Sequence, residues 1–283
     1  MAGAPARVAV IVPCFDDGPL VCEAVSSVEE SEPVEIVVVD DKSTDPTTLE
    51  QLERLRGKGV TVISHEVNSG VSRARMTGLE RSSAPFVFPL DADDLAVAGR
   101  LSELADRLEA DPATGVVFGD YEEFGTRTLV RAVPPELDPY RLAYTNEYPI
   151  SALFRRSRLE EVGGFEPAGY DGRSYEDWNL WLTLAERGER GAHAGVGKIV
   201  YRRRLHGQRK LQRAKRRHRQ LYGKLRAAHP QIFSSLHEHR QGSDLSLARK
   251  LLYPVVYGGR RRFSFEAGVK SLLDKARVWT LRR

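Results

Sequence analysis

The chain has 283 residues, of which 41% are hydrophobic and 29% charged, with 24 glycines, 15 prolines and two cysteines. This composition excludes collagen-like, coiled-coil and wholly disordered proteins, and two cysteines exclude a secreted module held together by several disulfides. No apolar run reaches the roughly 18 residues of a membrane-spanning helix, and none near the start resembles a signal-peptide core, so we expect a cytoplasmic protein.

Charge is divided unevenly along the chain. Residues 1–200 carry 20 Lys and Arg against 35 Asp and Glu, whereas residues 201–283 carry 23 against 4. The composition changes near residue 205, which predicts an acidic catalytic unit, 1–205, and a basic, mainly helical C-terminal region, 206–283. Such a region favours a phosphate-bearing partner, or it folds back on the acidic unit.

The first 90 residues alternate short buried strands with amphipathic helices. Apolar, mostly β-branched runs predict strands buried on both faces at 8–12, 34–39, 60–64 and 86–90. Hydrophobic residues recur at helical spacing in the segments 19–30, 47–56 and 69–81. Strands and helices in this order form right-handed βαβ units, which predicts an α/β fold with a parallel sheet.

The alternation loosens after residue 94. The pattern predicts a helix over 99–110, a strand over 116–119 and a proline-rich crossing between 134 and 139. A second helix is expected over 175–187, closed by Gly188, and a last strand over 199–201.

Acidic side chains follow two of the predicted strands directly. Three carboxylates in the segment 91–94 follow the strand 86–90, and Asp40 and Asp41 end the strand 34–39. The carboxyl ends of parallel strands share one edge of a sheet, where open α/β folds bind ligands. Carboxylates there suit Mg²⁺ or Mn²⁺ bridging to substrate phosphates, although helix and turn capping explains the same acids.

A further polar segment opens the helix 69–81. Asn68 precedes this helix, and Arg73 and Arg75 lie in its first two turns. Backbone N–H groups and guanidinium groups at a helix N-terminus both favour an anion. The alternative is a pair of solvated surface arginines.

Taken in order, five motifs resemble those of the family 2 glycosyltransferases, which have the GT-A fold. They are VPCFD at 12–16, DDKSTD at 40–45, NSGVSRAR at 68–75, DADD at 91–94 and EDW at 176–178. The resemblance covers about residues 7–205, and the ordered set is much more specific than any one motif. It implies a Rossmann-like, mostly parallel central sheet flanked by helices. The implied reaction is an inverting, metal-dependent transfer of a sugar from a nucleoside-diphosphate donor to an acceptor hydroxyl.

The resemblance also implies roles on the donor side. Phe15 would lie against the nucleobase, Asp40 would read its edge, and Arg75 would sit in the nucleotide site. Asp93 would ligate Mn²⁺ or Mg²⁺, with Asp91 on the ribose and metal side of the donor. The residues expected to bind the nucleotide sugar are Pro13, Phe15, Asp16, Asp40, Asn68, Arg75, Asp91 and Ala92.

On the acceptor side the resemblance makes Asp177 the catalytic base, with Glu176 in reserve. The reaction itself requires a carboxylate within about 3 Å of the acceptor hydroxyl and a cation to neutralise the departing diphosphate. Ordinary N-terminal helix chemistry also accounts for both acids. His206 resembles a histidine that some relatives place near the metal, although a solvated histidine among arginines is the commoner situation.

The sequence departs from the family pattern at three positions. Phe15 stands where tyrosine is commoner, Asp16 where asparagine is usual, and Met76 where asparagine usually follows the Ala-Arg pair. The nucleobase is therefore left open, with UDP as the default. A nucleotidyltransferase would need a basic glycine-rich loop after the first strand, which 13–19 lacks, and a silent nucleotide- or nucleic-acid-binding protein would not need the acids at 91, 93 and 177.

The partners follow from the implied reaction and from the basic region. We expect a nucleotide-diphosphate sugar as donor and a hydroxyl acceptor, lipid-linked in bacterial cell-envelope or glycoconjugate synthesis. Residues 247–257 mix apolar and cationic side chains, a combination typical of peripheral contact with the anionic cytoplasmic face of a membrane. No nucleic acid is expected, because no reader motif accompanies the arginines.

Overall fold

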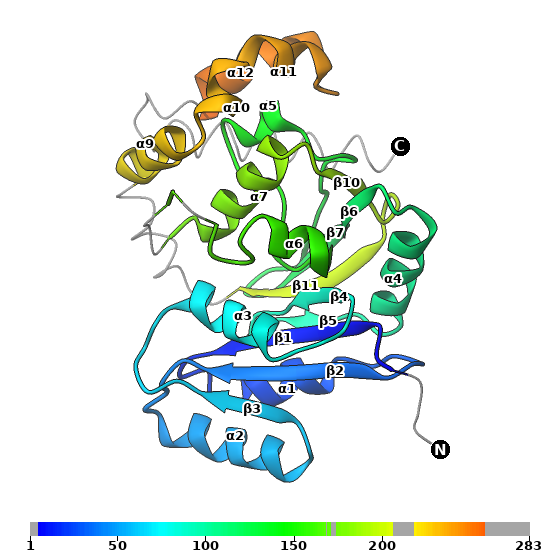
Figure 1. Cartoon of the computed structure of the whole chain (residues 1–283), viewed down its shortest axis with the longest axis vertical. Coiled ribbons are helices and arrows are strands. Elements are labelled where there is room, and N and C mark those ends of the chain that lie inside the picture. The colour runs from blue at the N-terminus through cyan, green and yellow to red at the C-terminus, as the bar shows by residue number, and fades with distance from the viewer. Residues whose placement is uncertain (1–4, 168, 171–173, 206–217, 258–283) are drawn as a thin grey trace.

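The computed structural model describes residues 5–167, 169–170, 174–205 and 218–257 (Figure 1). Its centre is a seven-stranded sheet in the order β10-β6-β9-β4-β1-β2-β3. The strands are β1 (Val8–Cys14), β2 (Val34–Asp40), β3 (Thr61–Ser64), β4 (Phe86–Pro89), β6 (Thr114–Phe118), β9 (Leu153–Arg155) and β10 (Arg190–His193). Only β9 runs antiparallel to its neighbours in this sheet, so the prediction of a mostly parallel sheet is confirmed.

A second, four-stranded sheet has the order β5-β11-β7-β8. Its strands are β5 (Leu95–Ala96), β7 (Asp120–Gly125), β8 (Leu129–Arg131) and β11 (Ile199–Leu205). The hairpin of β7 and β8 was not predicted, because its charged sequence has no continuous apolar run. The pairing of β11 with β5 brings the arginines of β11 beside the acidic segment that precedes β5.

Helices cover both faces of the main sheet. On one face lie α1 (Leu20–Ser26), α2 (Pro46–Gly57) and α4 (Arg100–Ala110), and on the other α3 (Val71–Glu80), α6 (Arg156–Glu161) and α7 (Glu176–Glu186). Successive side chains of β1 alternate between the two cores, Val10 in the first and Ile11 in the second. The α3 helix lies so close to β1 that a Cβ at Gly78 would collide with Ile11.

Two helices are shorter than the hydrophobic pattern predicts. The α1 helix ends at Ser26 instead of near residue 30, and the Ser27 hydroxyl donates to the carbonyl of Ala24 at 2.6 Å. Such a side-chain bond competes with helix continuation. The α3 helix begins at Val71 because Gly70 has φ of 94°, outside the helical region.

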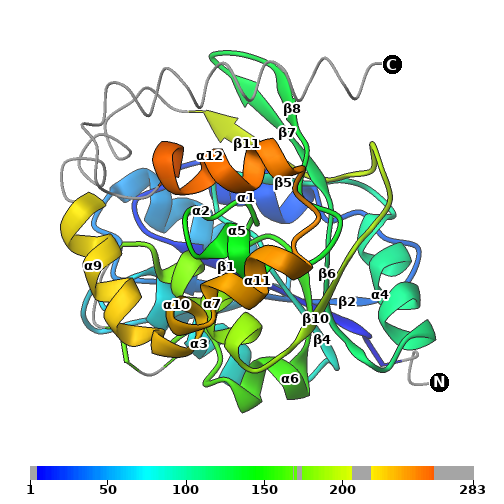
Figure 2. The same ribbon diagram turned by 90° about the horizontal axis from the view of Figure 1, so that it is seen from above.

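The C-terminal helices lie at one end of the molecule, against α5 (Pro139–Leu142) and α7 (Figures 1 and 2). They are α9 (His218–Ala228), α10 (Pro230–Ser234), α11 (Leu236–Gly242) and α12 (Leu247–Tyr257). Tyr222, Leu225 and Ile232 join the hydrophobic core around α7. The described part of the basic region is thus helical and folds back on the body. Among the described residues, no helix has the length and apolarity needed to cross a bilayer.

Candidate functional site

The acidic segments that follow β2 and β4 lie at one edge of the main sheet. Both strands run parallel to β1, with Asp40 beside Cys14 and Pro89 beside Ile11. Asp40 and the segment 91–94 are therefore at the same carboxyl edge, as the strand pattern predicts.

Asp91, Asp93 and Asp94 form a carboxylate cluster, each offering one oxygen within 4.8 Å of the others. Asp94 is buried, and its Oδ1 accepts the backbone N–H of Arg204 at 2.8 Å. Burial, together with the charges of Asp91 and Asp93, raises the pKa of Asp94 to about 8. A divalent cation would relieve this repulsion, and carboxylate oxygens are the ligands that Mg²⁺ and Mn²⁺ prefer. The three residues therefore fit the metal that the family resemblance implies.

Arg75 lies between this cluster and the first turn of α7. Its buried guanidinium donates from Nη2 to Oδ1 of Asp91 at 2.7 Å, and Nη1 lies 3.7 Å from Oε1 of Glu176. Its Nε is buried without a hydrogen-bond acceptor among the described residues. Arg75 thus links an acid at the carboxyl edge of the main sheet to an acid of α7.

The first turn of α7 carries the two acids that were candidates for the base. Tyr175, just before it, has φ of 67°, a strained conformation for a non-glycine residue and one that clusters at functional sites. Asp177 accepts from Asn146 Nδ2 at Oδ2 (2.9 Å) and from the N–H of Trp178 at Oδ1 (2.8 Å). Burial raises the pKa of Asp177, and burial with the neighbouring charge of Asp177 raises the pKa of Glu176 to about 7.

Both groups of acids line one cavity of about 280 Å³. Its lining residues are Arg75, Asp91, Asp94, Tyr121, Asn146, Glu147, Tyr148, Pro149, Ile150, Ser151, Glu176, Asp177, Tyr201 and Arg203. The cavity therefore joins the carboxyl edge of the main sheet, the second sheet, the segment 146–151 and α7. A carboxylate cluster and a separate carboxylate with a raised pKa in one cavity suit metal-assisted transfer with general base catalysis.

Several lining residues were missed by sequence reasoning. Asn146 lies in an irregular segment that offers no periodicity or motif, so nothing in the sequence marked it. Arg203 is one of three consecutive arginines, and only the alternation along β11 separates it from its neighbours. Tyr121 and Tyr201, from β7 and β11, stack with their ring centroids 5.1 Å apart.

The residues expected to contact the nucleobase lie near the ends of β1 and β2, outside the cavity lining. Phe15 is 46% exposed. Asp40 is buried, and its Oδ1 accepts the backbone N–H of Ser43 at 2.9 Å. Asp16 has φ of 55° and accepts the N–H groups of Thr44 and Asp45 at 2.7 and 2.8 Å, which ties the two loops together.

The other expected residues divide by burial. Pro13 and Ala92 are buried, and Asn68 is exposed. Asp93 belongs to the carboxylate cluster but is not among the cavity-lining residues. His206 lies outside the described residues.

Asp41 anchors the loop that carries Asn68, a role that sequence reasoning did not assign. Its carboxylate accepts the N–H groups of Ser69 and Gly70 at 2.8 and 2.7 Å. Nδ1 of His65 lies 2.8 Å from Oδ1 of Asp41. These bonds fix the entry to α3 and hence the position of Arg75.

Comparison with known proteins decides the family. The protein-family model described as Glycosyl transferase family 2 matches residues 9–163, which is more than half of the chain. The chain belongs to this family. It is a glycosyltransferase that uses a nucleotide-sugar donor, which excludes the nucleotidyltransferase and silent-binding alternatives.

Curated relatives of this family 2 enzyme come from several bacteria. The Escherichia coli UDP-Glc:alpha-D-GlcNAc-diphosphoundecaprenol beta-1,3-glucosyltransferase WfgD is 25% identical over 62% of this chain and 69% of its own length. The putative teichuronic acid biosynthesis glycosyltransferase TuaG of Bacillus subtilis is 38% identical over 64% and 73%. Two other relatives, y4gI of Sinorhizobium fredii and ExoU of Rhizobium meliloti, are matched over only 22% and 31% of their length.

Solved structures agree on the fold. Staphylococcus aureus TarS 1–349 in complex with UDP-GlcNAc has a TM-score of 0.61 at 22% identity, over 86% of this chain and 69% of that one. The mannosyltransferase PcManGT of Pyrobaculum calidifontis, in complex with GDP-Man and Mn²⁺, has a TM-score of 0.56 at 21% identity, over 99% and 85%. The expected GT-A fold is thereby confirmed.

Proposed function

We propose that this glycosyltransferase works by inversion and needs a divalent metal, moving a sugar from a nucleoside-diphosphate donor to an acceptor hydroxyl. One observation carries the proposal: Asp91 and Asp94 line the same cavity as Glu176 and Asp177, with Arg75 between the two groups. Inversion requires the acceptor to attack opposite to the departing diphosphate, so the base and the diphosphate site must be separate parts of one cavity.

Asp177 is the proposed base. Its two oxygens accept from Asn146 and from the N–H of Trp178, so the side chain is held in one orientation. Glu176 is instead paired with Arg75. As the acceptor oxygen bonds to the anomeric carbon, its proton passes to Asp177, and the bond from that carbon to the diphosphate oxygen breaks with its electrons.

Asp91, Asp93 and Asp94 are the proposed ligands of Mn²⁺ or Mg²⁺, and His206 remains a candidate for a further one. The bound ion would neutralise negative charge on the leaving diphosphate. Arg203 is solvent-accessible, lines the same cavity and supplies a fixed positive charge there.

The relatives support a UDP-sugar donor and an acceptor linked to lipid. WfgD is named for a UDP-Glc donor and a diphosphoundecaprenol-linked acceptor, and the TarS complex contains UDP-GlcNAc. We therefore propose that the enzyme acts in bacterial cell-envelope glycan synthesis, at the cytoplasmic face of the membrane. We expect no nucleic-acid partner, because no reader motif accompanies the arginines.

A thermal-shift screen of UDP-, GDP- and dTDP-sugars, with and without Mn²⁺, tests the donor and the metal together. We expect stabilisation by a UDP-sugar that EDTA abolishes and Mn²⁺ restores. The stabilising donor is then incubated with acceptors, and the anomeric configuration of the product is read by NMR. A product that keeps the donor's configuration, or turnover unaffected by EDTA, would contradict the proposal.

A further inference from the structure

One face of the α12 helix packs against the body of the protein and forms hydrogen bonds with it. Tyr253 packs with Tyr140 and Leu245 in a small buried cluster. Pro254 has no N–H, so the carbonyl of Lys250 lacks its usual helical donor and accepts the Tyr140 hydroxyl at 2.5 Å. The Tyr253 hydroxyl donates to Oε2 of Glu147 at 2.7 Å. These contacts determine which face of α12 turns outward.

The outward face of α12 is apolar. Leu247, Leu251, Leu252 and Val255 are 71%, 55%, 48% and 44% exposed. Leu247, Leu251 and Val255 recur every four residues and so lie on one stripe of the helix, and Leu252, three residues before Val255, lies at its edge. Among the other helices of the described chain, only α2 has a large exposed hydrophobic residue, Leu49. Solvent-facing helix surfaces are normally polar, so a contiguous stripe of this kind marks an interaction surface.

The charge around this stripe indicates the kind of partner. In the described C-terminal helices α9–α12, residues 218–257, six Lys and Arg stand against two acids. On α12 itself, Arg249 and Lys250 accompany the apolar residues. A second copy of the chain would bring an equally cationic region against the first, which is unfavourable. An anionic bilayer offers both acyl chains for the stripe and phosphates for the cations.

We propose that α12 lies in the headgroup boundary of an anionic membrane, with its leucine and valine stripe among the acyl chains. The inner face of α12 bonds to Glu147, which lines the cavity. The bilayer would then lie about one helix diameter, roughly 10 Å, from the cavity wall. Membrane binding by α12 extends the proposed function. It rests on that function only in the assumption that the acceptor is lipid-linked.

Sedimentation of the full chain with vesicles tests the surface directly. Binding is compared between phosphatidylcholine alone and phosphatidylcholine with 30% phosphatidylglycerol. One variant combines Leu247→Ser, Leu251→Ser and Val255→Ser. Its matched control combines Val67→Ser, Val130→Ser and Val196→Ser, three exposed valines outside α12. We expect binding to the anionic vesicles, a loss of about tenfold or more in the α12 variant, and little change in the control.

The outcomes separate this surface from the proposed function. Equal binding to the two kinds of vesicle would contradict the proposal that α12 binds an anionic membrane. So would the absence of binding to either kind, or an equal loss of binding in the α12 variant and its control. So would a dimer in solution that the α12 substitutions dissolve, because a second copy would then be the occupant. Donor stabilisation with Mn²⁺ is measured on the same variants and should not change. If the donor with Mn²⁺ does not stabilise the unsubstituted chain, that result would count against the proposed function and not against membrane binding by α12.

Discussion

Two parts of the proposed active site are built in different ways: the proposed donor edge, at the carboxyl ends of β1, β2 and β4, and the proposed acceptor side, formed by α7 and the segment 146–151. Near the carboxyl ends of β1 and β2, carboxylates bond to loops near in sequence: Asp41, for example, accepts the N–H groups of Ser69 and Gly70, fewer than 30 residues away. On the acceptor side, the bond from Tyr253 to Glu147 spans 106 residues. Much of the proposed donor edge is thus held within consecutive βαβ units, although Asp94 also accepts the N–H of Arg204, 110 residues away. The proposed acceptor side depends in addition on the C-terminal helices.

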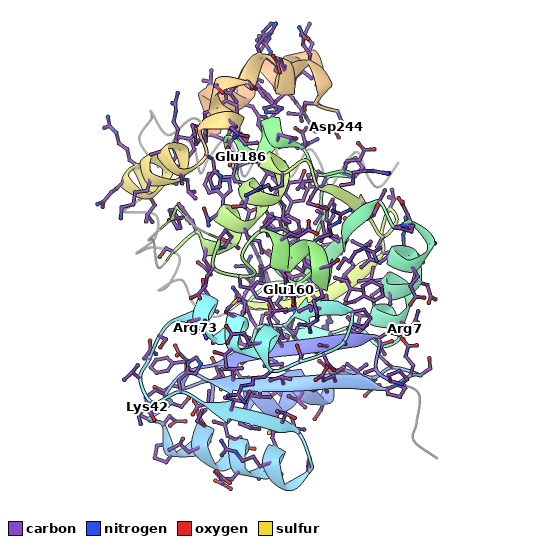
Figure 3. The ribbon with its side chains drawn as sticks, in the orientation of Figure 1. Arg7, Lys42, Arg73, Glu160, Glu186 and Asp244 are labelled. Atoms are coloured by element: carbon purple, nitrogen blue, oxygen red, sulfur yellow. The ribbon has the colours of Figure 1, made fainter. Side chains whose placement is uncertain are left out.

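Long-range contacts also join the body to the C-terminal helices. His229 lies between Glu186 and Asn179 of α7, 2.8 Å from each, and Arg141 of α5 donates to Asp244. Glu186 and Asp244 are labelled near this boundary in Figure 3. We therefore expect changes at the donor edge to weaken nucleotide binding and changes on the acceptor side to impair transfer while leaving the donor bound.

The sharpest test of this separation is Asp177→Asn. Loss of the base should lower kcat by about 10³-fold, while the Kd for the donor with Mn²⁺ stays the same. Rates come from release of the nucleoside diphosphate, and binding comes from calorimetry. Glu176→Gln is the matched control and should lose less. If Glu176→Gln loses more than Asp177→Asn, the two acids exchange roles.

The corresponding change at the donor edge is Asp93→Ala. Removal of one carboxylate from the cluster should weaken Mn²⁺-dependent binding of UDP by about 100-fold, because the cation would lose a charged ligand. Calorimetry with and without Mn²⁺ measures the effect. Asp106→Asn in α4, an exposed acid outside the cavity lining, serves as control. Undiminished Mn²⁺ dependence would remove Asp93 from the proposed ligands.

The pH profile tests the environment of the base. Burial raises the pKa of Asp177, and the pKa of Glu176 is raised to about 7. Since the base acts in its ionised form, a raised pKa brings the loss of activity closer to neutral pH. We expect kcat/KM to fall about tenfold for each pH unit below the pKa of the base. Glu176→Gln should move this acid limb of the profile to lower pH. A limb near pH 4 would show that Asp177 is not buried during turnover.

Asn146→Ala tests a positioning residue on the acceptor side. The amide of Asn146 donates to Oδ2 of Asp177, which stabilises the carboxylate and its orientation. Its loss should lower kcat about tenfold and shift the acid limb to higher pH, with donor Kd unchanged. Asn146→Asp adds a negative charge and should move the limb further. An unshifted limb in both variants would leave Asn146 with a packing role only.

The smallest expected effect is that of Tyr253→Phe. Removing the hydroxyl breaks the bond to Glu147 and should lower the free energy of unfolding by about 1 kcal/mol. The acceptor KM should rise severalfold, whereas donor binding should be retained. Urea denaturation and acceptor titration measure these quantities. A larger change in donor Kd than in acceptor KM would contradict the division into two sides.

Much of the part of the fold that carries the proposed donor edge could be predicted from the sequence. The β-branched runs predict β1, β2, β3 and β4 to within two residues of their observed ends, because strands buried on both faces have no polar alternation. The five ordered motifs also identified the family and four of the acids that line the cavity, Asp91, Asp94, Glu176 and Asp177, but not Glu147. Helix ends were less predictable, since a side-chain bond at Ser27 and the conformation of Gly70 override the hydrophobic period.

By itself, the sequence determined the parallel sheet, the carboxylates at its edge and the basic character of the C-terminal region, since these follow from residue type and local order. Only the tertiary structure placed Arg75 between Asp91 and Glu176, brought Asn146 to Asp177 and turned the leucines of α12 outward. Such contacts join segments tens of residues apart, and they are decided by how helices and sheets pack and not by any periodicity within one segment.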